Sequence, residues 1–220
     1  MIQIFRSKYE HIFNFTIYGE RHSGTNFLEE CIKSKFNLPI TYFHGFKHWF
    51  GFAKPERINF DRHTLFIGVV RNPYNWLGAF YSSPHHVPRE NSLDFYRFLT
   101  NEWYSINYYN QEIMEDRNYT TKPNLSRYQN IFELRKEKNL YLSHIMPVIA
   151  SNYILLSYEG LLYNHELYLN IIQQRFNLKT FGQPPKALEK PDLIISEPYK
   201  SLIDSNLDWS IENGLGYFRR

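Results

Sequence analysis

Short apolar segments alternate along the chain with longer stretches in which apolar residues recur every three or four positions. The clearest apolar segment is Thr64–Val70, which is typical of a central parallel strand buried on both faces. A second, Asn14–Tyr18, is rich in β-branched and aromatic residues and also predicts a buried strand. We expect strands at residues 13–18, 40–43, 64–70 and 152–157.

Apolar residues at helical spacing predict the helices. From Phe27 to Phe36 they form one face, and Pro39 stops that helix because proline and the residue before it leave helical space. Residues 1–12 are expected to be a lead-in, and loops are expected around Pro55 and at 83–88 and 179–198. The expected helices are 25–36, one that starts at 77–81, 92–109, 131–149, 165–176 and 199–213, with a polar, mobile flap at about 110–130.

This alternation of strands and helices predicts an α/β fold. Strands joined by helices form parallel sheets through right-handed crossovers, with helices on both faces. We therefore expect a three-layer α/β/α arrangement around a central parallel sheet. A length of 220 residues suits one domain, so residues 1–220 are expected to form a single domain.

The turn that follows the first predicted strand, Gly19–Asn26, carries the strongest functional signal. Two glycines permit unusual backbone angles, and Ser23, Thr25 and Asn26 are helix-capping types. A strand, a glycine-bearing turn and a helix together direct backbone N–H groups and the positive end of a helix dipole at an anion. Arg21 adds a fixed charge, so the turn predicts a phosphate or sulfate pocket.

Distinctive polar clusters follow each of the other predicted strands. Lys47 and His48 follow the second, Arg71-Asn72 the third and Tyr158-Glu159 the fourth. Ligands of parallel α/β sheets bind where the carboxyl ends of strands meet, so we expect these clusters to converge on one edge.

Composition and charge narrow the possible partners. The net charge is +3, which suits an anionic cofactor or acidic substrate, and the sequence contains no basic run of the nucleic-acid-binding type. One cysteine, Cys31, fits a reducing compartment. Neither a signal-peptide core nor an apolar run of membrane-spanning length is found, so we expect a cytoplasmic protein without stable membrane insertion.

Three segments resemble, in the family's order, the sulfotransferases that use 3′-phosphoadenosine 5′-phosphosulfate (PAPS). Gly19–Leu28 is similar to their 5′-phosphosulfate loop, Val70–Tyr81 to their 3′-phosphate motif and Leu155–Leu162 to their strand ending in Tyr-Glu-Asp-Leu. Lys47-His48 stands where many members carry Lys and His near the acceptor. The resemblance implies a P-loop NTPase-like sulfotransferase fold and transfer of a sulfuryl group from PAPS, with 3′-phosphoadenosine 5′-phosphate (PAP) as product, to a hydroxyl acceptor, a saccharide or small molecule.

The resemblance also implies roles for single residues, with no metal required. His48 would be the acceptor's general base, and Lys47 a cation near the bridging oxygen or the transferred group. Arg71 would pair with the 3′-phosphate, for which a guanidinium is well shaped, and Tyr158 would lie near the adenine. The 5′-phosphosulfate would be held by Ser23, Gly24, Thr25 and Asn26.

Two positions depart from the family pattern. Where the family has Lys or Arg before Ser/Thr-Gly, this chain has His22, so either Arg21 or a protonated His22 would supply the cation. Where the family has serine eight residues after the 3′-phosphate arginine, this chain has Ala79, and Ser82 or Ser83 is a possible substitute.

Other functions are considered beside this one. A P-loop kinase or other phosphotransferase is disfavoured because Thr25-Asn26 stands where Lys-Ser/Thr should follow the glycine. A non-catalytic nucleotide- or glycan-binding module is the second alternative. His44 and His48 have a helical metal spacing, but Gly45 favours a loop there. The pair His85-His86 is a candidate lining for an acceptor cleft.

Overall fold

The computed structural model describes residues 2–6, 11–48, 51, 54–117, 126–187 and 194–219. By its contacts the chain divides into two compact units. Unit 1 comprises Met1–Arg71 and Leu142–Lys190, and unit 2 comprises Asn72–Tyr141 and Pro191–Arg220. The expectation of a single domain stays a prediction.

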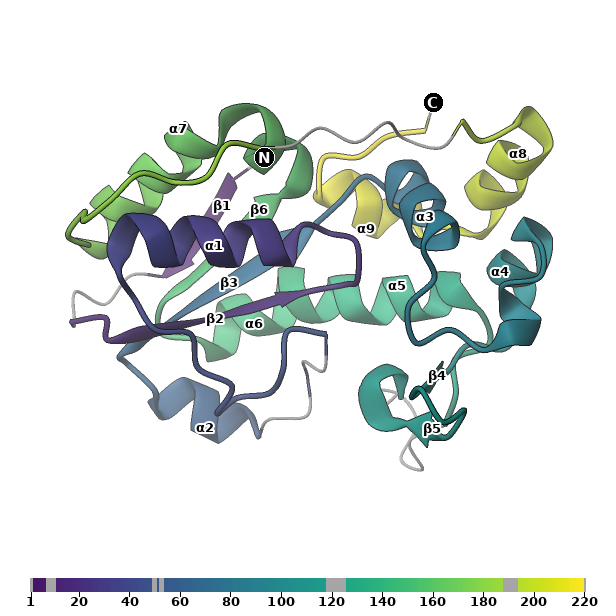
Figure 1. The fold of residues 1–220 in the computed structure, drawn as a ribbon, viewed down its shortest axis with the longest axis horizontal. Coiled ribbons are helices and arrows are strands. Elements are labelled where there is room, and N and C mark those ends of the chain that lie inside the picture. Colours follow the sequence, from purple (N-terminus) through teal and green to yellow (C-terminus); the bar gives the residue numbers. More distant parts are fainter. Residues whose placement is uncertain are drawn as a thin grey trace. The chain divides into compact units, whose positions relative to one another are not determined.

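Unit 1 is built around an open four-stranded sheet of order β1-β6-β3-β2 (Figure 1). Strands β2 (Asn14–Gly19), β3 (Thr64–Val70) and β6 (Tyr153–Ser157) are mutually parallel. The edge strand β1 (Ile2–Arg6) pairs antiparallel with β6. The α/β class is therefore confirmed, but the expected all-parallel sheet is wrong because the lead-in contributes a reversed edge strand.

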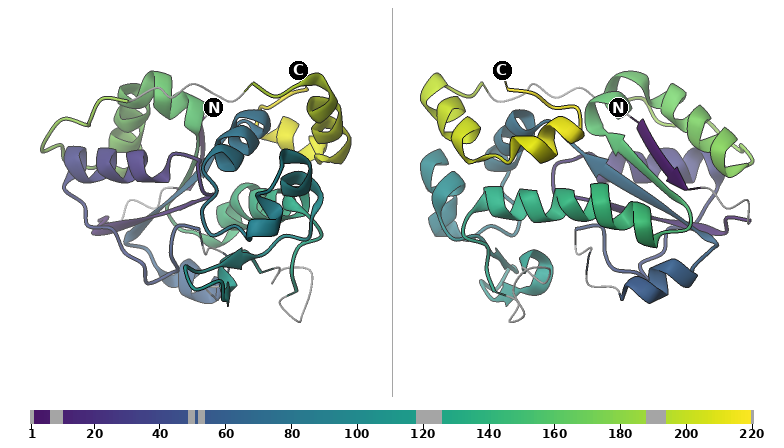
Figure 2. Two further views of the ribbon diagram at one scale, coloured as in Figure 1. Left: turned by 45° about the vertical axis from the view of Figure 1, so that its right-hand side comes forward. Right: turned by 180° about the vertical axis from the view of Figure 1, so that it is seen from behind.

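Helices cover both faces of this sheet. Helix α1 (Thr25–Phe36) and the kinked α7 (Tyr158–Phe176) pack side by side on one face, with their apolar side chains in a single core with the strands. Helix α6 (Met146–Ile149) lies on the opposite side of the sheet from α1 (Figure 2) and contacts α2 (Pro55–Phe60). All seven residues of β3 are buried, as its apolar pattern predicts.

Of three further expectations for unit 1, one is confirmed and two are wrong. Helix α1 has the predicted bounds. The strand expected at 40–43 is wrong, because only Ile40 pairs with Phe15, in an isolated parallel bridge. The loop expected around Pro55 is also wrong, since a proline suits the first turn of a helix and begins α2 there.

Asp61 ties the start of β3 to the loop that precedes α2. Its carboxylate accepts hydrogen bonds from the Thr64 hydroxyl at 2.7 Å and pairs with His44 Nε2 at 2.7 Å, and the backbone N–H groups of His63 and Thr64 donate to it. Burial acts to raise the pKa of Asp61, but these hydrogen bonds outweigh it and hold that pKa below its ordinary value.

Unit 2 is mainly helical and has its own apolar core. The helix expected at 131–149 is confirmed. It consists of α5 (Ile131–Leu140), the π-helical stretch Tyr141–Ile145 and α6. A short hairpin joins β4 to β5. The elements of unit 2 are α3 (Pro73–Ser82), α4 (Phe95–Thr100), β4 (Ser105–Ile106), β5 (Glu112–Ile113), α5 (Ile131–Leu140), α8 (Glu197–Asn206) and α9 (Trp209–Gly214), with short 3-10 segments at Arg89–Asn91 and Met114–Asp116.

Two predicted helices of unit 2 are shorter than expected. The helix expected at 92–109 ends at Thr100, because Trp103 pairs with Tyr128 and the chain continues into β4. The helix expected at 199–213 is broken by the extended Leu207 into α8 and α9. Of the flap expected at 110–130, residues 118–125 lie outside the described residues.

A buried ion pair connects α5 with α9 inside unit 2. The Arg135 guanidinium donates to both carboxylate oxygens of Glu212, at 2.6 and 2.8 Å, and Asn139 donates to the same carboxylate. The Arg135 guanidinium also lies 5.0 Å from the centre of the Trp76 ring. Neither charged side chain is more than 4% exposed, so each depends on the other for its compensation.

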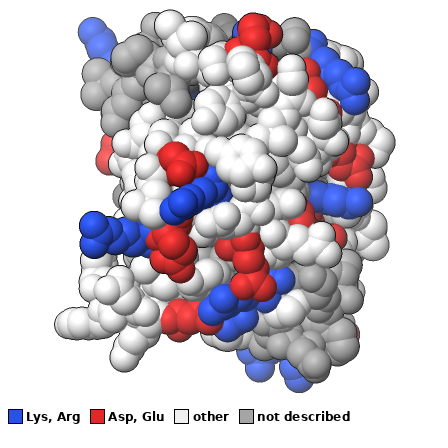
Figure 3. Space-filling model, turned by 90° about the vertical axis from the view of Figure 1, so that its right-hand side faces the viewer, with Lys and Arg blue, Asp and Glu red and all other residues white. Residues whose placement is uncertain are grey.

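The surface carries charges of both signs. On the face drawn in Figure 3, acidic and basic side chains lie beside one another. The exposed ion pairs include Arg127–Glu112 at 2.9 Å and Arg97–Asp94 at 3.4 Å. Among the described helices, none combines the length and the hydropathy that a membrane span requires.

Candidate anion-binding site

The site predicted from the sequence lies entirely within unit 1, at the carboxyl ends of its parallel strands. The turn after β2 reaches the start of α1 through two residues with left-handed backbone angles, His22 (φ 62°) and Gly24 (φ 86°). A Cβ on Gly24 would stand 2.4 Å from the ring of Tyr158. Only glycine combines that φ with so close an approach, so the turn and the Tyr158 ring are fitted to each other.

The amino end of α1 presents backbone N–H groups that have no partner among the described residues. Among the described residues, no side chain caps this helix, and its first backbone bond is donated by Leu28 to the carbonyl of Gly24 at 3.1 Å. The N–H groups of Thr25, Asn26 and Phe27 make no hydrogen bond within the described part of the chain. Such N–H groups at the positive end of a twelve-residue helix attract phosphate or sulfate oxygens.

Arg71 directly follows β3 and contacts both the turn after β2 and Tyr158, which follows β6. It is 8% exposed, and its guanidinium donates to the carbonyl of His22 at 2.8 Å. The same guanidinium lies over the ring of Tyr158, 4.3 Å from its centre. The ends of β2, β3 and β6 thus meet at Arg71, which is the convergence that the sequence predicts.

Lys47 and His48 pack against the same turn. The Lys47 ammonium donates to the side-chain oxygen of Asn26 and lies 3.6 Å from the carboxylate of Glu29. The Lys47 carbonyl accepts a hydrogen bond from the N–H of Gly19 at 3.0 Å. These bonds hold a cation beside the first turn of α1.

The environment of His48 assigns its tautomer. Its Nδ1 lies 2.6 Å from the carbonyl oxygen of Gly19. A carbonyl only accepts, so Nδ1 carries the proton, and in a neutral ring Nε2 then bears the lone pair. This is the tautomer in which Nε2 can accept a proton.

The remaining predicted turn residues are engaged with the backbone or buried. The Ser23 hydroxyl donates to the carbonyl of Glu20 at 2.5 Å, and the Ser23 N–H donates to the same oxygen. Arg21 is 2% exposed, whereas the His22 side chain is half-buried.

Burial raises the pKa of the nearby Cys31 thiol to about 12, and the charge of Glu30 adds to this, so Cys31 is a core residue without thiolate chemistry.

Two further interpretations of the sequence concern a metal pair and a substitute for the serine that Ala79 replaces. His44 is directed at Asp61 and His48 at Gly19, so the two do not share a ligand, and the described residues contain no cluster suited to a metal ion. Ala79 lies in α3 of unit 2, where the hydroxyl of Ser82 donates to its own helix at 2.8 Å.

His86 of unit 2 has a partner that the sequence did not indicate. Its Nδ1 lies 2.8 Å from the carboxylate of Glu115, which is almost fully buried, and its ring stacks on His85 with the centres 4.0 Å apart. His86 itself has a left-handed backbone (φ 60°). Glu20 and Glu29, which lie in or beside the turn, were also missed, because a carboxylate at an anion site contradicts the pattern that sequence reading seeks.

Comparisons of this chain with models of known families, with curated proteins and with solved structures give no match.

Proposed function

We propose that this protein transfers a sulfuryl group from PAPS to a hydroxyl of a saccharide or small molecule. The observation that supports this most is the meeting of three strand ends at Arg71, beside a helix whose first N–H groups are uncapped. One side of this site offers N–H donors and Lys47, and the other offers a guanidinium stacked on an aromatic ring. An anionic nucleotide has complementary groups: phosphate or sulfate oxygens for the N–H donors, Lys47 and Arg71, and an aromatic base for the ring of Tyr158.

The residues fit such a donor in type. Thr25, Asn26 and Phe27 would hold the sulfate end through their backbone N–H groups, with Lys47 as the adjacent cation. A guanidinium has five N–H donors, so Arg71 can keep its bond to the His22 carbonyl while it pairs with a phosphate. When bound, PAPS supplies the activated sulfuryl group, and the chain supplies position and charge.

The site also contains a base for the acceptor. His48 Nε2 carries the lone pair once Nδ1 is committed to the Gly19 carbonyl, and this bond also fixes the orientation of the ring. His48 would take the hydroxyl proton of the acceptor. Lys47 and either Arg21 or His22 would stabilise charge that develops on the transferred group.

Calorimetry with PAP and with ATP tests the donor. We expect PAP to bind and ATP to bind at least about tenfold more weakly, and Arg71→Lys to weaken PAP binding because an ammonium cannot replace a bidentate guanidinium. Lys200→Gln, which removes a half-buried lysine of α8 that pairs with Glu197, is the matched control. Tighter binding of ATP than of PAP would refute the proposal and favour a kinase.

Turnover tests the base. Using release of PAP from PAPS in the presence of a panel of saccharides and phenols, His48→Ala should lower the rate by about 10²–10⁴-fold while PAP affinity is kept. An unchanged rate removes His48 from the mechanism. PAP binding without any turnover, including slow hydrolysis of PAPS, would instead favour a non-catalytic binding module.

A further inference from the structure

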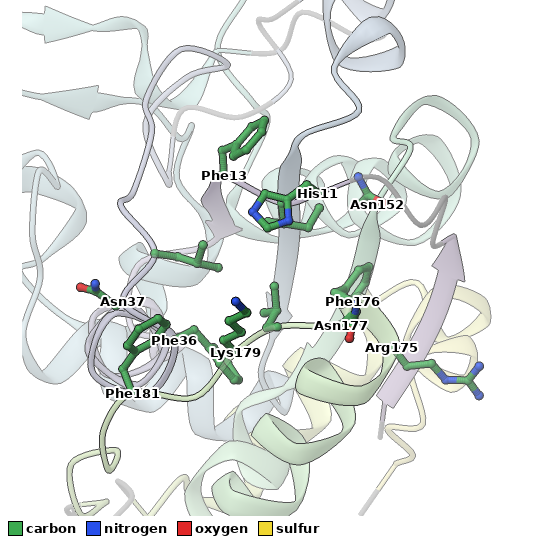
Figure 4. A pocket seen from close by; sticks show the side chains of 13 residues that line it. His11, Phe13, Phe36, Asn37, Asn152, Arg175, Phe176, Asn177, Lys179 and Phe181 are labelled. Atoms are coloured by element: carbon green, nitrogen blue, oxygen red, sulfur yellow. The ribbon is translucent and has the colours of Figure 1, made fainter.

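A hollow of about 540 Å³ opens in unit 1 at the amino ends of the strands. The anion-binding turn lies at the opposite, carboxyl ends of these strands. The hollow lies where β2 and β6 begin, next to residues 11–13 and Asn152. The carboxyl ends of α1 and α7 form its other walls (Figure 4). We name it the amino-edge hollow. Its volume is in the range of small-molecule pockets.

Aromatic rings dominate its walls. Phe36 and Phe176, from the last turns of α1 and α7, are buried in the core and present part of their rings to the hollow. Phe13 and Phe181 stand on its rim, 54% and 66% exposed. Large, solvent-exposed aromatic side chains around one concave site indicate a surface that can bind an apolar ligand.

The charges around the hollow have one sign. The charged side chains in its lining are Lys179 and Arg175, and none of the described residues that line it is acidic. Lys179 extends toward the middle of the lining side chains, whereas Arg175 points away (Figure 4). Lys179 forms no ion pair with any described residue, so its ammonium is complementary to an incoming anion.

The hollow is formed before any ligand arrives. The N–H of Phe181 donates to the carbonyl of Lys35 at 2.8 Å, and Gly182 packs so closely on α1 that a Cβ there would stand 2.7 Å from the carbonyl of Ser34. These contacts pin the segment after α7 to the end of α1. A preformed site avoids the entropy cost of ordering its walls on binding.

Two helix carboxyl ends would by themselves disfavour an anion. Here some of the terminal carbonyls are already used: Lys33 accepts from the N–H of Asn37, and Gln173 from the N–H of Leu178, both at 3.0 Å. The carbonyl of Lys35 accepts from Phe181 as described above. The ammonium of Lys179 carries a full positive charge, which is larger than the partial charge of about −0.5 at a helix carboxyl end.

We propose that the amino-edge hollow is a binding site for a small aromatic anion, a carboxylate or sulfonate whose ring packs among the phenylalanines and whose charge meets Lys179. This site is separate from the donor site, since it lies at the other edge of the sheet, and it does not depend on the function proposed above.

A matched pair of fluorescent probes tests this proposal on the full chain. Anilinonaphthalene sulfonate carries the charge, and N-phenylnaphthylamine is the same ring system without it. We expect saturable binding of both probes, with the sulfonate bound more tightly. Lys179→Gln should weaken the sulfonate by about 3–10-fold and leave the neutral probe unchanged, as a solvent-accessible ion pair would. Phe181→Ser, at an exposed position, should weaken both probes.

Lys200→Gln is the control for a general loss of positive charge, and excess PAP should displace neither probe. The proposal is overturned if neither probe binds saturably, or if Lys179→Gln and Phe181→Ser leave both affinities unchanged. It is also overturned if Lys200→Gln has the same effect as Lys179→Gln. Circular dichroism of each variant establishes that the fold is kept.

Discussion

Gly24 and Tyr158 provide the sharpest test of the site's geometry. Gly24 has φ 86°, and a Cβ at this position would stand 2.4 and 2.8 Å from two carbons of the Tyr158 ring. Gly24→Ala therefore introduces two separate costs. One is the backbone strain of an L-residue in left-handed space, and the other is a steric clash that exists only while the ring is present.

The size of each cost follows from general magnitudes, and a second substitution separates the two. Left-handed backbone costs an alanine about 1–2 kcal/mol. Forcing a methyl group into occupied space costs about 1–3 kcal/mol more, because the ring must leave its place over the Arg71 guanidinium. In a Tyr158→Ala background only the strain remains. The double-mutant cycle should thus show a coupling of about 1–3 kcal/mol between the two positions.

Urea unfolding of the wild type, both single variants and the double variant measures this coupling. Gly214→Ala is the matched control, since a Cβ there would meet nothing within 4 Å, and it should be close to neutral. Equal destabilisation by Gly24→Ala in both backgrounds, within about 0.5 kcal/mol, would show that the ring does not lie against the turn and would refute the site as described.

Three further results are expected. Cys31, whose thiol is buried and has a pKa raised to about 12, should resist iodoacetamide in the native protein at pH 8 and react on unfolding; rapid native labelling would contradict its burial. Because the pKa of Asp61 is lowered by folding, its stabilisation is complete above the unfolded value of about 3.9 and is lost as pH falls through the lower folded value. Asp61→Asn should accordingly remove part of the acid-induced loss of stability, and an unchanged stability–pH curve would be the contrary outcome. Glu212→Gln should destabilise by about 3–5 kcal/mol in urea, since it leaves Arg135 buried without a counter-charge, and a cost below about 1 kcal/mol would argue against that burial.

Local pattern predicted those parts of the fold that depend on neighbours in the sequence. The bounds of α1 and β3 follow from periodicity and from a continuous apolar run. The strand expected at 40–43 has the right composition, yet only Ile40 finds a partner, because pairing depends on what lies beside it in space. For the same reason β1 could not be predicted: its partner, β6, lies about 150 positions along the chain, and its own five residues carry little pattern.

For the candidate site, too, the residues could be predicted from the sequence, whereas most of their contacts could not. Residue types and strand ends indicated that the turn, Arg71 and Tyr158 would converge, and the structure brings them into contact. The contacts themselves depend on backbone positions that no residue type encodes, such as the His22 carbonyl that Arg71 binds. Glu115, the partner of His86, lies 29 residues away from it in a stretch without a recognisable motif.

Neither unit is continuous in the sequence, and this has a consequence for how the protein is made. Unit 1 lacks the partner of its first strand until residue 157 has left the ribosome, and unit 2 lacks Glu212, the counter-charge of Arg135, until a further 77 residues have followed Arg135. During translation both halves therefore expose apolar surface and a guanidinium that later become interior. The nascent chain should consequently need protection by chaperones longer than a protein whose domains emerge one after the other.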